Sequence, residues 1–276
     1  MTSTIGIIAG AGHFPLHVAK AAAQQGRHVI GIGLTGWVDA SLAQHVAAYE
    51  EVSVGQLGRL VERCRAHGVA EAVMAGKVTK EVLFDPSIEF DAAAVAVIGG
   101  VKEYSVNALL GGIAQHLAGE GIRLLDSSTF LKHFLCPAGP QTAKHPTPEE
   151  DTDIALGVRT ASLLADLDVG QTVVVKRRVI VAVEALEGTD AAIQRAGQVG
   201  GPGGVVVKMA SPSQDMRFDI PVLGLRTVEV ARAAGIAVLA VEAGKTLILD
   251  PDAVRREADA AGLSIVGVTR APAASS

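Results

Sequence analysis

Aromatic residues are scarce in this sequence: phenylalanine, tyrosine and tryptophan together make up 3% of its 276 residues. Proteins that bind single-stranded nucleic acid stack bases on aromatic side chains, so this scarcity disfavours that class. Clustered basic charge is also lacking, because the net charge is −5 and no long run of lysine and arginine occurs. The sequence therefore does not indicate a basic surface that could bind a phosphate backbone, and we expect no nucleic-acid partner.

Cysteines and long apolar runs are equally sparse. The two cysteines, Cys64 and Cys136, lie far apart without a CxxC spacing, which predicts reduced, structural thiols. The longest apolar stretch, Ala92–Val101, is far shorter than the roughly 20 residues of a membrane-spanning helix. Because no basic region followed by an apolar one begins the sequence, we expect a cytoplasmic protein.

Small aliphatic residues dominate instead. Apolar residues account for 49% of the chain, 31 residues are glycine, and the mean hydropathy is +0.36. At about 150 residues per domain, the length predicts roughly two domains with packed cores. The high hydropathy leaves two explanations open, a large α/β core or a core together with a surface that contacts lipid.

The first half alternates short apolar runs with helical patterns, which predicts βαβ units and a Rossmann-like parallel sheet. The expected strands are 5–9, 28–34, 70–75 and 121–126. The expected helices are 14–25, 57–66, 91–98 and 106–118.

A proline-rich stretch, CPAGPQTAKHPTP, marks the expected domain boundary. We predict an N-terminal domain over 1–135, a linker over 136–148 and a distinct α/β C-terminal domain over 149–276. The C-terminal domain should begin with a helix capped by Thr147 and continue into strand-rich segments, with a turn at Arg177-Arg178.

A glycine loop follows the first expected strand. Gly10, Ala11, Gly12 and His13 lead into a helix, where glycine backbone and free helix N–H groups favour an anion such as phosphate. The dinucleotide pattern GxGxxG is incomplete, because Pro15 replaces the third glycine. No acidic residue ends the second strand either, so NAD binding is disfavoured. A tight turn without a ligand remains the alternative.

Gly76 and Lys77 follow the strand expected at 70–75. Ligands of open α/β sheets gather at the carboxyl ends of the strands, so Lys77 is a candidate for binding an anion there. The alternative is an ordinary solvated lysine.

Charged residues interrupt apolar segments of the second half. Glu184 and Lys208 each lie within an expected strand, which predicts that they pair with each other or share a ligand, because an unpaired buried charge is costly. Gly188, Thr189 and Asp190 follow Glu184 and form a turn into the next helix. Asp190 is either a ligand of the site or an ordinary helix cap.

Asp219 is the candidate catalytic residue, since the Ile220-Pro221 that follows favours an extended, rigid backbone. Its alternative role is to cap a turn. Asp219, Asp190 and Glu187 are the predicted metal ligands. Because these are hard oxygen donors without cysteine or paired histidine, we expect Mg²⁺, with Mn²⁺ as the alternative, rather than zinc.

Several segments together resemble the LpxI-type UDP-2,3-diacylglucosamine pyrophosphatases of the lipid A pathway. They are IGIIAGAGHFPLHVAKAA from residue 5, MAGKV at 74–78, VAVEALEGTDAAI at 181–193, VKMASPSQDMRFDIPVLG at 207–224 and AGIAVLAVEAGKTLILD at 234–250. The resemblance extends over 4–268, and the EGTD and DxPxxG segments are its most specific parts.

The resemblance implies hydrolysis of UDP-2,3-diacylglucosamine to lipid X and UMP with a divalent cation, commonly Mg²⁺. It also implies a Rossmann-like N-terminal domain, a distinct α/β C-terminal domain with the lipid-bearing substrate held between them, a homodimer, and a cytoplasmic location with peripheral contact to the inner membrane. The family's essential aspartate falls on Asp219. The alternatives are an NAD(P)-dependent oxidoreductase and a non-catalytic module that binds a nucleotide sugar or a lipid.

Overall fold

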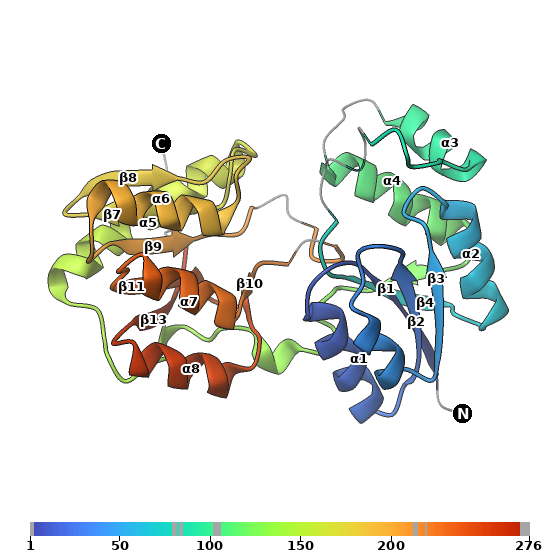
Figure 1. Cartoon of the computed structure of the whole chain (residues 1–276), viewed down its shortest axis with the longest axis horizontal. Helices are drawn as coiled ribbons and strands as arrows, with labels where there is room; N and C mark the ends of the chain where they lie inside the picture. The colour runs from blue at the N-terminus through green and yellow to red at the C-terminus, as the bar shows by residue number, and fades with distance from the viewer. Residues whose placement is uncertain are drawn as a thin grey trace. The chain divides into compact units, whose positions relative to one another are not determined.

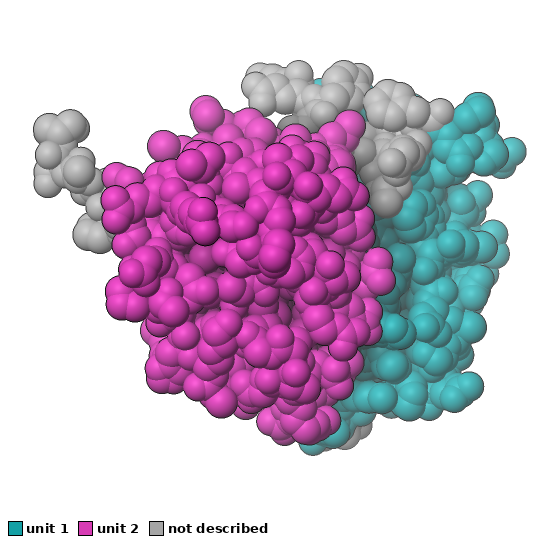
Figure 2. Space-filling model, turned by 60° about the vertical axis from the view of Figure 1, so that its left-hand side comes forward, with its two compact units in different colours: residues 1–132, 215–219 teal, residues 133–214, 220–276 magenta. Residues whose placement is uncertain are grey.

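The computed structural model describes residues 3–78, 82, 85–101, 106–211, 215–218 and 220–270. The chain forms two compact units, which Figure 2 distinguishes by colour. Unit 1 comprises residues 1–132 and 215–219, and unit 2 comprises residues 133–214 and 220–276. The predicted class, a Rossmann-like parallel-sheet unit and a separate α/β unit, is confirmed.

Unit 1 is built on a parallel sheet with the strand order β3-β2-β1-β4-β5. Figure 1 labels its first four strands, β1 to β4. Its strands are β1 (Thr4–Ala9), β2 (His28–Leu34), β3 (Ala48–Val52), β4 (Glu71–Ala75) and β5 (Arg123–Leu124). Its helices are α1 (Phe14–Gln24), the 3-10 helix η1 (Ala40–His45), α2 (Leu57–Ala66), α3 (Ala92–Gly100) and α4 (Val106–Gly119).

The apolar side chains of the strands hold this sheet between helices. Ile8, Ile30 and Ile32 belong to a buried cluster that also contains side chains of α2, α3 and α4. Helix α1 packs against β1, β2 and β4. Since β1 is paired with β2 on one side and with β4 on the other, the strand order reverses between β1 and β4. This is the topological switch point at which such sheets bind ligands, beyond the carboxyl ends of the strands.

Unit 2 contains a mixed sheet with the order β6-β13-β11-β9-β7-β8. Its strands are β6 (Gly139–Pro140), β7 (Thr172–Lys176), β8 (Val179–Val183), β9 (Val205–Lys208), β11 (Val238–Glu242) and β13 (Ser264–Val268), and a separate pair is formed by β10 (Val222–Leu223) and β12 (Leu247–Ile248). Its helices are α5 (Pro148–Asp166), α6 (Thr189–Gly200), α7 (Leu225–Ala233) and α8 (Pro251–Ala260). The short 3-10 helix η3 (Lys132–Phe134) spans the boundary between the two units in the sequence.

Two apolar layers cover the faces of this sheet. Helix α5 contributes Ile154, Val158 and Ala161 to one buried cluster. Helices α6, α7 and α8 contribute to a second cluster, which includes Val206 and Leu239 of the strands. The alternation of side chains along each buried strand supplies both layers.

The expected turn at Arg177-Arg178 connects β7 and β8. Both arginines have left-handed backbone, with φ of 49° and 63°. The buried carboxylate of Asp153 in α5 accepts hydrogen bonds from their backbone N–H groups at 2.8 and 2.6 Å. An acidic side chain thus fixes a hairpin turn, and no catalytic role is needed to explain its burial.

The stretch predicted as a linker is part of unit 2. Within it, Gly139–Pro140 forms β6 and pairs with β13, and the Thr142 hydroxyl accepts a hydrogen bond from the N–H of Ile265 at 2.8 Å. Most of the stretch is a loop, as its prolines and glycines indicated, but Gly139, Pro140 and Gln141 pair with the edge of the sheet. Residues 136–148 therefore belong to the second unit rather than forming a linker outside it.

Both cysteines are free and buried. Burial raises the pKa of Cys64 and of Cys136 to about 12 and about 11 respectively. Because only the thiolate is nucleophilic, these residues are inert structural thiols, as expected.

Candidate functional site

The glycine loop after β1 lies directly beside the loop after β4. The N–H of Gly10 donates to the carbonyl of Ala75 at 2.8 Å. Ala11 and Lys77 exchange two backbone hydrogen bonds, each 2.9 Å long, and form an isolated antiparallel bridge. The structure therefore brings together the two loops at the switch point of the parallel sheet.

Two of the glycines are needed for this contact between loops. A Cβ atom on Gly10 would lie 2.8 Å from the Lys77 carbonyl oxygen, and one on Gly76 would lie 2.7 Å from the Gly10 carbonyl carbon. Gly12 differs, because no atom lies within 4 Å of the position of its Cβ. Gly10 and Gly76 thus serve loop packing, whereas Gly12 leaves open space in which a ligand can approach the backbone.

Helix α1 begins immediately after this loop. His13 is its N-cap residue but makes no side-chain cap, and the first turn carries no acidic side chain. The positive end of the helix is therefore not neutralised by its own first turn. Gly12, His13 and Lys77 are exposed, so the N-terminal end of α1 and the ammonium group of Lys77 are accessible to an anion at the switch point.

The substitution Gly76→Ala tests the loop contact. Gly76 and Gly12 have nearly the same φ, +92° and +91°. Both substitutions should incur backbone strain of about 1–3 kcal/mol. Only Gly76→Ala adds a collision with the neighbouring loop, so it should lower the free energy of unfolding in urea more than Gly12→Ala. Equal losses would contradict the proposed role of Gly76.

A polar cluster in unit 2 joins the charged residues predicted to pair. The ammonium group of Lys208 donates to the Thr189 hydroxyl at 2.8 Å, and that hydroxyl donates to Glu184 Oε1 at 2.9 Å. Glu184 and Lys208 are thus connected through Thr189 rather than by a direct ion pair. Lys208 ends β9, whereas Glu184 follows β8 instead of lying within a strand as expected. The shared threonine explains how the unit accommodates both charges.

The cluster retains an unused hydrogen-bond acceptor. Glu184 Oε2 is buried and has no hydrogen-bond partner among the described residues. The buried residue Thr172 places its hydroxyl 3.4 Å from that of Thr189. Thr172 escaped the sequence analysis because a threonine at the start of an apolar strand is an ordinary β-former.

The substitution Thr189→Val tests this network, with Thr172→Val as its control. Valine preserves the shape of threonine but leaves Lys208 and Glu184 without their shared partner. Loss of hydrogen bonds to buried polar groups costs about 1–3 kcal/mol, so Thr189→Val should destabilise the protein by this amount in urea unfolding. Thr172→Val should cost less, because its contact with Thr189 is long; the opposite order would contradict the network.

The other acidic candidates, Glu187 and Asp190, are paired with arginines. Glu187 accepts a hydrogen bond from Arg195 at 2.6 Å. The pKa of its carboxyl group is lowered, first by a hydrogen bond from its own backbone amide and second by the hydrogen bond from Arg195. Asp190 lies 3.3 Å from Arg226. Gly188, which precedes α6, has a φ of 84° and forms the turn before that helix.

A preformed metal site is not visible in the described part of the chain. Within it, no three histidine, cysteine, aspartate or glutamate side chains lie close enough together to hold a metal ion. The third predicted ligand, Asp219, lies outside the described residues. Its catalytic role and the metal ligand set therefore remain predictions.

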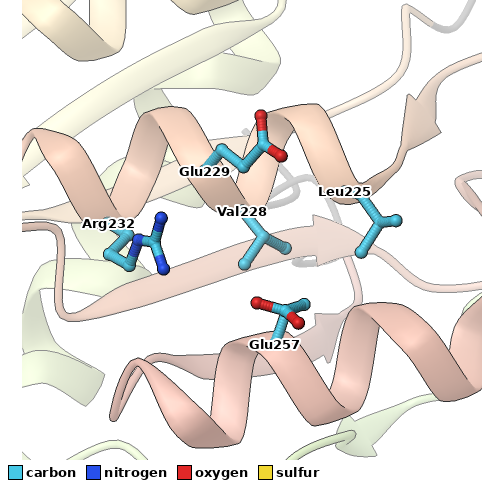
Figure 3. A pocket seen from close by; sticks show the side chains of 5 residues that line it. All are labelled: Leu225, Val228, Glu229, Arg232 and Glu257. Atoms are coloured by element: carbon cyan, nitrogen blue, oxygen red, sulfur yellow. The ribbon is translucent and has the colours of Figure 1, made fainter.

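A surface pocket lies between α7 and α8 of unit 2 (Figure 3). It is lined by Leu225, Val228, Glu229, Arg232 and Glu257. None of these belongs to the predicted site, and the pocket contains two carboxylates and one guanidinium around a small apolar floor. We assign it no part in the chemistry.

A parallel sheet with a glycine loop at its switch point, followed by a second α/β unit with a mixed sheet, defines a two-unit α/β protein. The model of the LpxI N-terminal domain matches residues 4–134, and that of the LpxI C-terminal domain matches residues 137–266. The chain belongs to the LpxI family.

A relative from Caulobacter vibrioides is named UDP-2,3-diacylglucosamine pyrophosphatase LpxI. It is 30% identical over 96% of this chain and 97% of its own length. The match therefore includes both units.

Solved structures show only low similarity. The Bordetella bronchiseptica enzyme WbmG in complex with NAD and UDP has 19% identity and a TM-score of 0.28, covering 43% of this chain and 34% of that one. CobK precorrin-6A reductase has 13% identity and a TM-score of 0.32, covering 100% and 91%. These scores support no argument about function.

Proposed function

We propose that this protein hydrolyses the pyrophosphate bond of UDP-2,3-diacylglucosamine, releasing UMP and lipid X. The observation that carries the proposal is the match along both units to a relative named for action on this substrate. The two candidate regions provide groups suited to an anionic substrate. The reaction is the attack of water on a phosphorus atom, with a phosphate oxygen as the leaving group.

In unit 1, we assign binding of the nucleotide or a phosphate to Gly10, Ala11, Gly12 and His13, together with Gly76 and Lys77. The open space at Gly12 and the positive end of α1 support this assignment. Lys77 would add a full positive charge beside the loop. Such charge stabilises the negative charge that develops on phosphate oxygens.

In unit 2, we assign substrate binding to Glu184, Gly188, Thr189, Asp190 and Lys208. The hydrogen bond to Thr189 orients the Lys208 ammonium group, which retains further donors for a phosphate oxygen. The unpartnered Glu184 Oε2 supports a polar ligand at this cluster, because a buried acceptor without a partner is costly.

Asp219 is proposed to accept a proton from the attacking water or to ligate a metal ion. Mg²⁺, or Mn²⁺ in its place, supplies charge neutralisation on a diphosphate and orientation of water. Mg²⁺ commonly uses one or two carboxylates together with substrate phosphates, so a preformed protein site is not required. Glu187 and Asp190 would each have to exchange an arginine for the ion.

The substrate also bears on where the protein acts. In the described part of the chain, no helix is long and apolar enough to cross a membrane. We propose a cytoplasmic homodimer that contacts the inner membrane peripherally, since a diacylated substrate partitions into lipid.

Mass spectrometry of ligands that co-purify with the protein distinguishes this function from its alternatives. Lipid X or the intact diacylated nucleotide supports the proposal. Stable capture of that nucleotide without turnover would instead identify a binding module. An NAD(P)-dependent oxidoreductase would retain nicotinamide nucleotide and show a thermal shift with NAD(P)H, which the incomplete GxGxxG pattern argues against.

A further inference from the structure

A turn from the second half of the sequence is built into unit 1. Residues 215–219 belong to this unit, although the segments before and after them belong to unit 2. The chain therefore leaves unit 2 before Asp215 and returns to it at Ile220. Within the turn, the N–H of Phe218 donates to the Asp215 carbonyl at 3.1 Å.

Ser127 anchors this turn. Its backbone N–H donates to the Met216 carbonyl at 2.8 Å, and its hydroxyl lies 2.7 Å from the Arg217 carbonyl and 2.8 Å from the Met74 carbonyl. Ser127 is 1% exposed. Since a serine hydroxyl has one hydrogen, the two carbonyls share a single donor, which ties the turn to strand β4.

The turn is also held by its own side chains. Phe218 packs against the buried cluster formed by α2, α3, α4 and the sheet. Asp215 accepts hydrogen bonds from the backbone N–H of Arg217 at 3.0 Å and from its guanidinium group at 2.9 Å. The guanidinium lowers the pKa of the Asp215 carboxyl group, so the pair remains charged at neutral pH. The turn therefore has a defined shape when it reaches Ser127.

The anchor lies close to the candidate binding loops of unit 1. Met74 is the next-to-last residue of β4, and Gly76 and Lys77 follow that strand. Ser127 comes shortly after β5, which pairs with β4. The turn consequently joins the carboxyl edge of the parallel sheet, where the glycine loop also lies. Asp219 follows Phe218 in the sequence.

We propose that Ser127 is a positioning residue for the hydrolytic reaction. By fixing residues 215–218 to the carboxyl end of β4, it determines the position of the residues that follow them in the sequence. It acts through this backbone and need not touch the substrate. Misplacement of a catalytic group by about 1 Å can reduce turnover about 100-fold, so loss of the anchor should be evident in kcat. The inference rests on the proposed function.

The experiment compares Ser127→Ala with Ser128→Ala in the full-length protein. Ser128 is also buried, at 4% exposure, but its hydroxyl bonds to Asp126 at 2.6 Å. Each variant loses one buried hydroxyl from the same segment. Hydrolysis of UDP-2,3-diacylglucosamine gives kcat and KM, and hydrogen–deuterium exchange reports on the amides of 215–218. Ser127→Thr retains a hydroxyl and serves as the rescue variant.

For Ser127→Ala, we expect kcat to fall about 10- to 100-fold with KM changed less than about threefold, and exchange at 215–218 to accelerate. Ser128→Ala should leave both unchanged, and Ser127→Thr should recover most of kcat. Unchanged turnover, unchanged exchange or an equal loss in Ser128→Ala would each overturn the proposal.

Two further results distinguish a variant that fails to fold from a failure of the proposed function. If Ser127→Ala does not fold, Ser127→Thr and Ser127→Cys are compared by the same two measurements. Because a thiol is a weaker hydrogen-bond donor than a hydroxyl, kcat must be higher for the threonine variant than for the cysteine variant. If the wild-type protein does not hydrolyse the substrate, the proposed function fails. The exchange data then still decide whether Ser127 holds the turn.

Discussion

Replacement of Asp219 by asparagine is expected to lower the rate of UMP release from UDP-2,3-diacylglucosamine by about 100- to 10,000-fold. Asparagine has nearly the same shape but can neither accept a proton at neutral pH nor supply a negative charge to a metal ion. The family resemblance at FDIP singles out this carboxylate. In addition, Pro221 restricts the backbone just after Asp219 to extended conformations.

Asp252→Asn is the matched control for this prediction. The side chain of Asp252 is 86% exposed, and among the residues that the structure describes its ion-pair partner is Arg255, at 3.5 Å, so its loss should leave turnover unchanged. Circular dichroism and urea unfolding would verify that Asp219→Asn is folded. Near-normal turnover by a folded Asp219→Asn protein would eliminate Asp219 as the catalytic residue.

Removal of divalent cations is expected to reduce turnover of the wild-type protein by at least about 100-fold, with recovery on addition of Mg²⁺ or Mn²⁺. Because Glu187 and Asp190 are paired with arginines, we expect the purified protein to contain little tightly bound metal. Inductively coupled plasma mass spectrometry measures that content, and a titration of Mg²⁺ into EDTA-treated protein measures the requirement.

Three results would contradict the metal prediction. Full activity in excess EDTA would exclude an essential, exchangeable cation. A stoichiometric ion that survives dialysis would mean that the protein alone forms a site, in disagreement with the arginine partners of Glu187 and Asp190. Restoration by Zn²⁺ but not Mg²⁺ would also conflict with the oxygen-rich ligand set.

The local parts of the fold were largely predictable from the sequence. Apolar periodicity located the strands and helices of both units, because each element buries one face or stripe. The neighbouring positions of the loops at Gly10 and Lys77 followed from the rule that parallel strands end at one edge. The connection of Glu184 with Lys208 also followed, since apolar surroundings require charges to be paired.

Features that depend on distant contacts were not predictable. Ser127 and Arg217 are separated by 90 positions, and no local pattern shows that residues 215–218 belong to the first unit. Strand β3 was missed because AYEEV is a polar edge strand, of which only Val52 is buried. Residues 136–148 have the composition of a linker, but pairing of β6 with β13 includes them in unit 2.

The glycine loop shows how sequence and structure contribute differently to the site. The sequence indicated an anion site from three closely spaced residues, Gly10, Ala11 and Gly12. The structure separates their roles, since Gly10 is required by the neighbouring loop and Gly12 has open space. A ligand contact at this loop should therefore be sought at Gly12 and His13.

The most direct test of the central claim is product analysis with the purified wild-type protein, Mg²⁺ and UDP-2,3-diacylglucosamine. Mass spectrometry should detect UMP and lipid X in equal amounts, increasing together as substrate disappears. A folded protein that leaves the substrate intact, or that releases UDP instead of UMP, would contradict the proposed reaction.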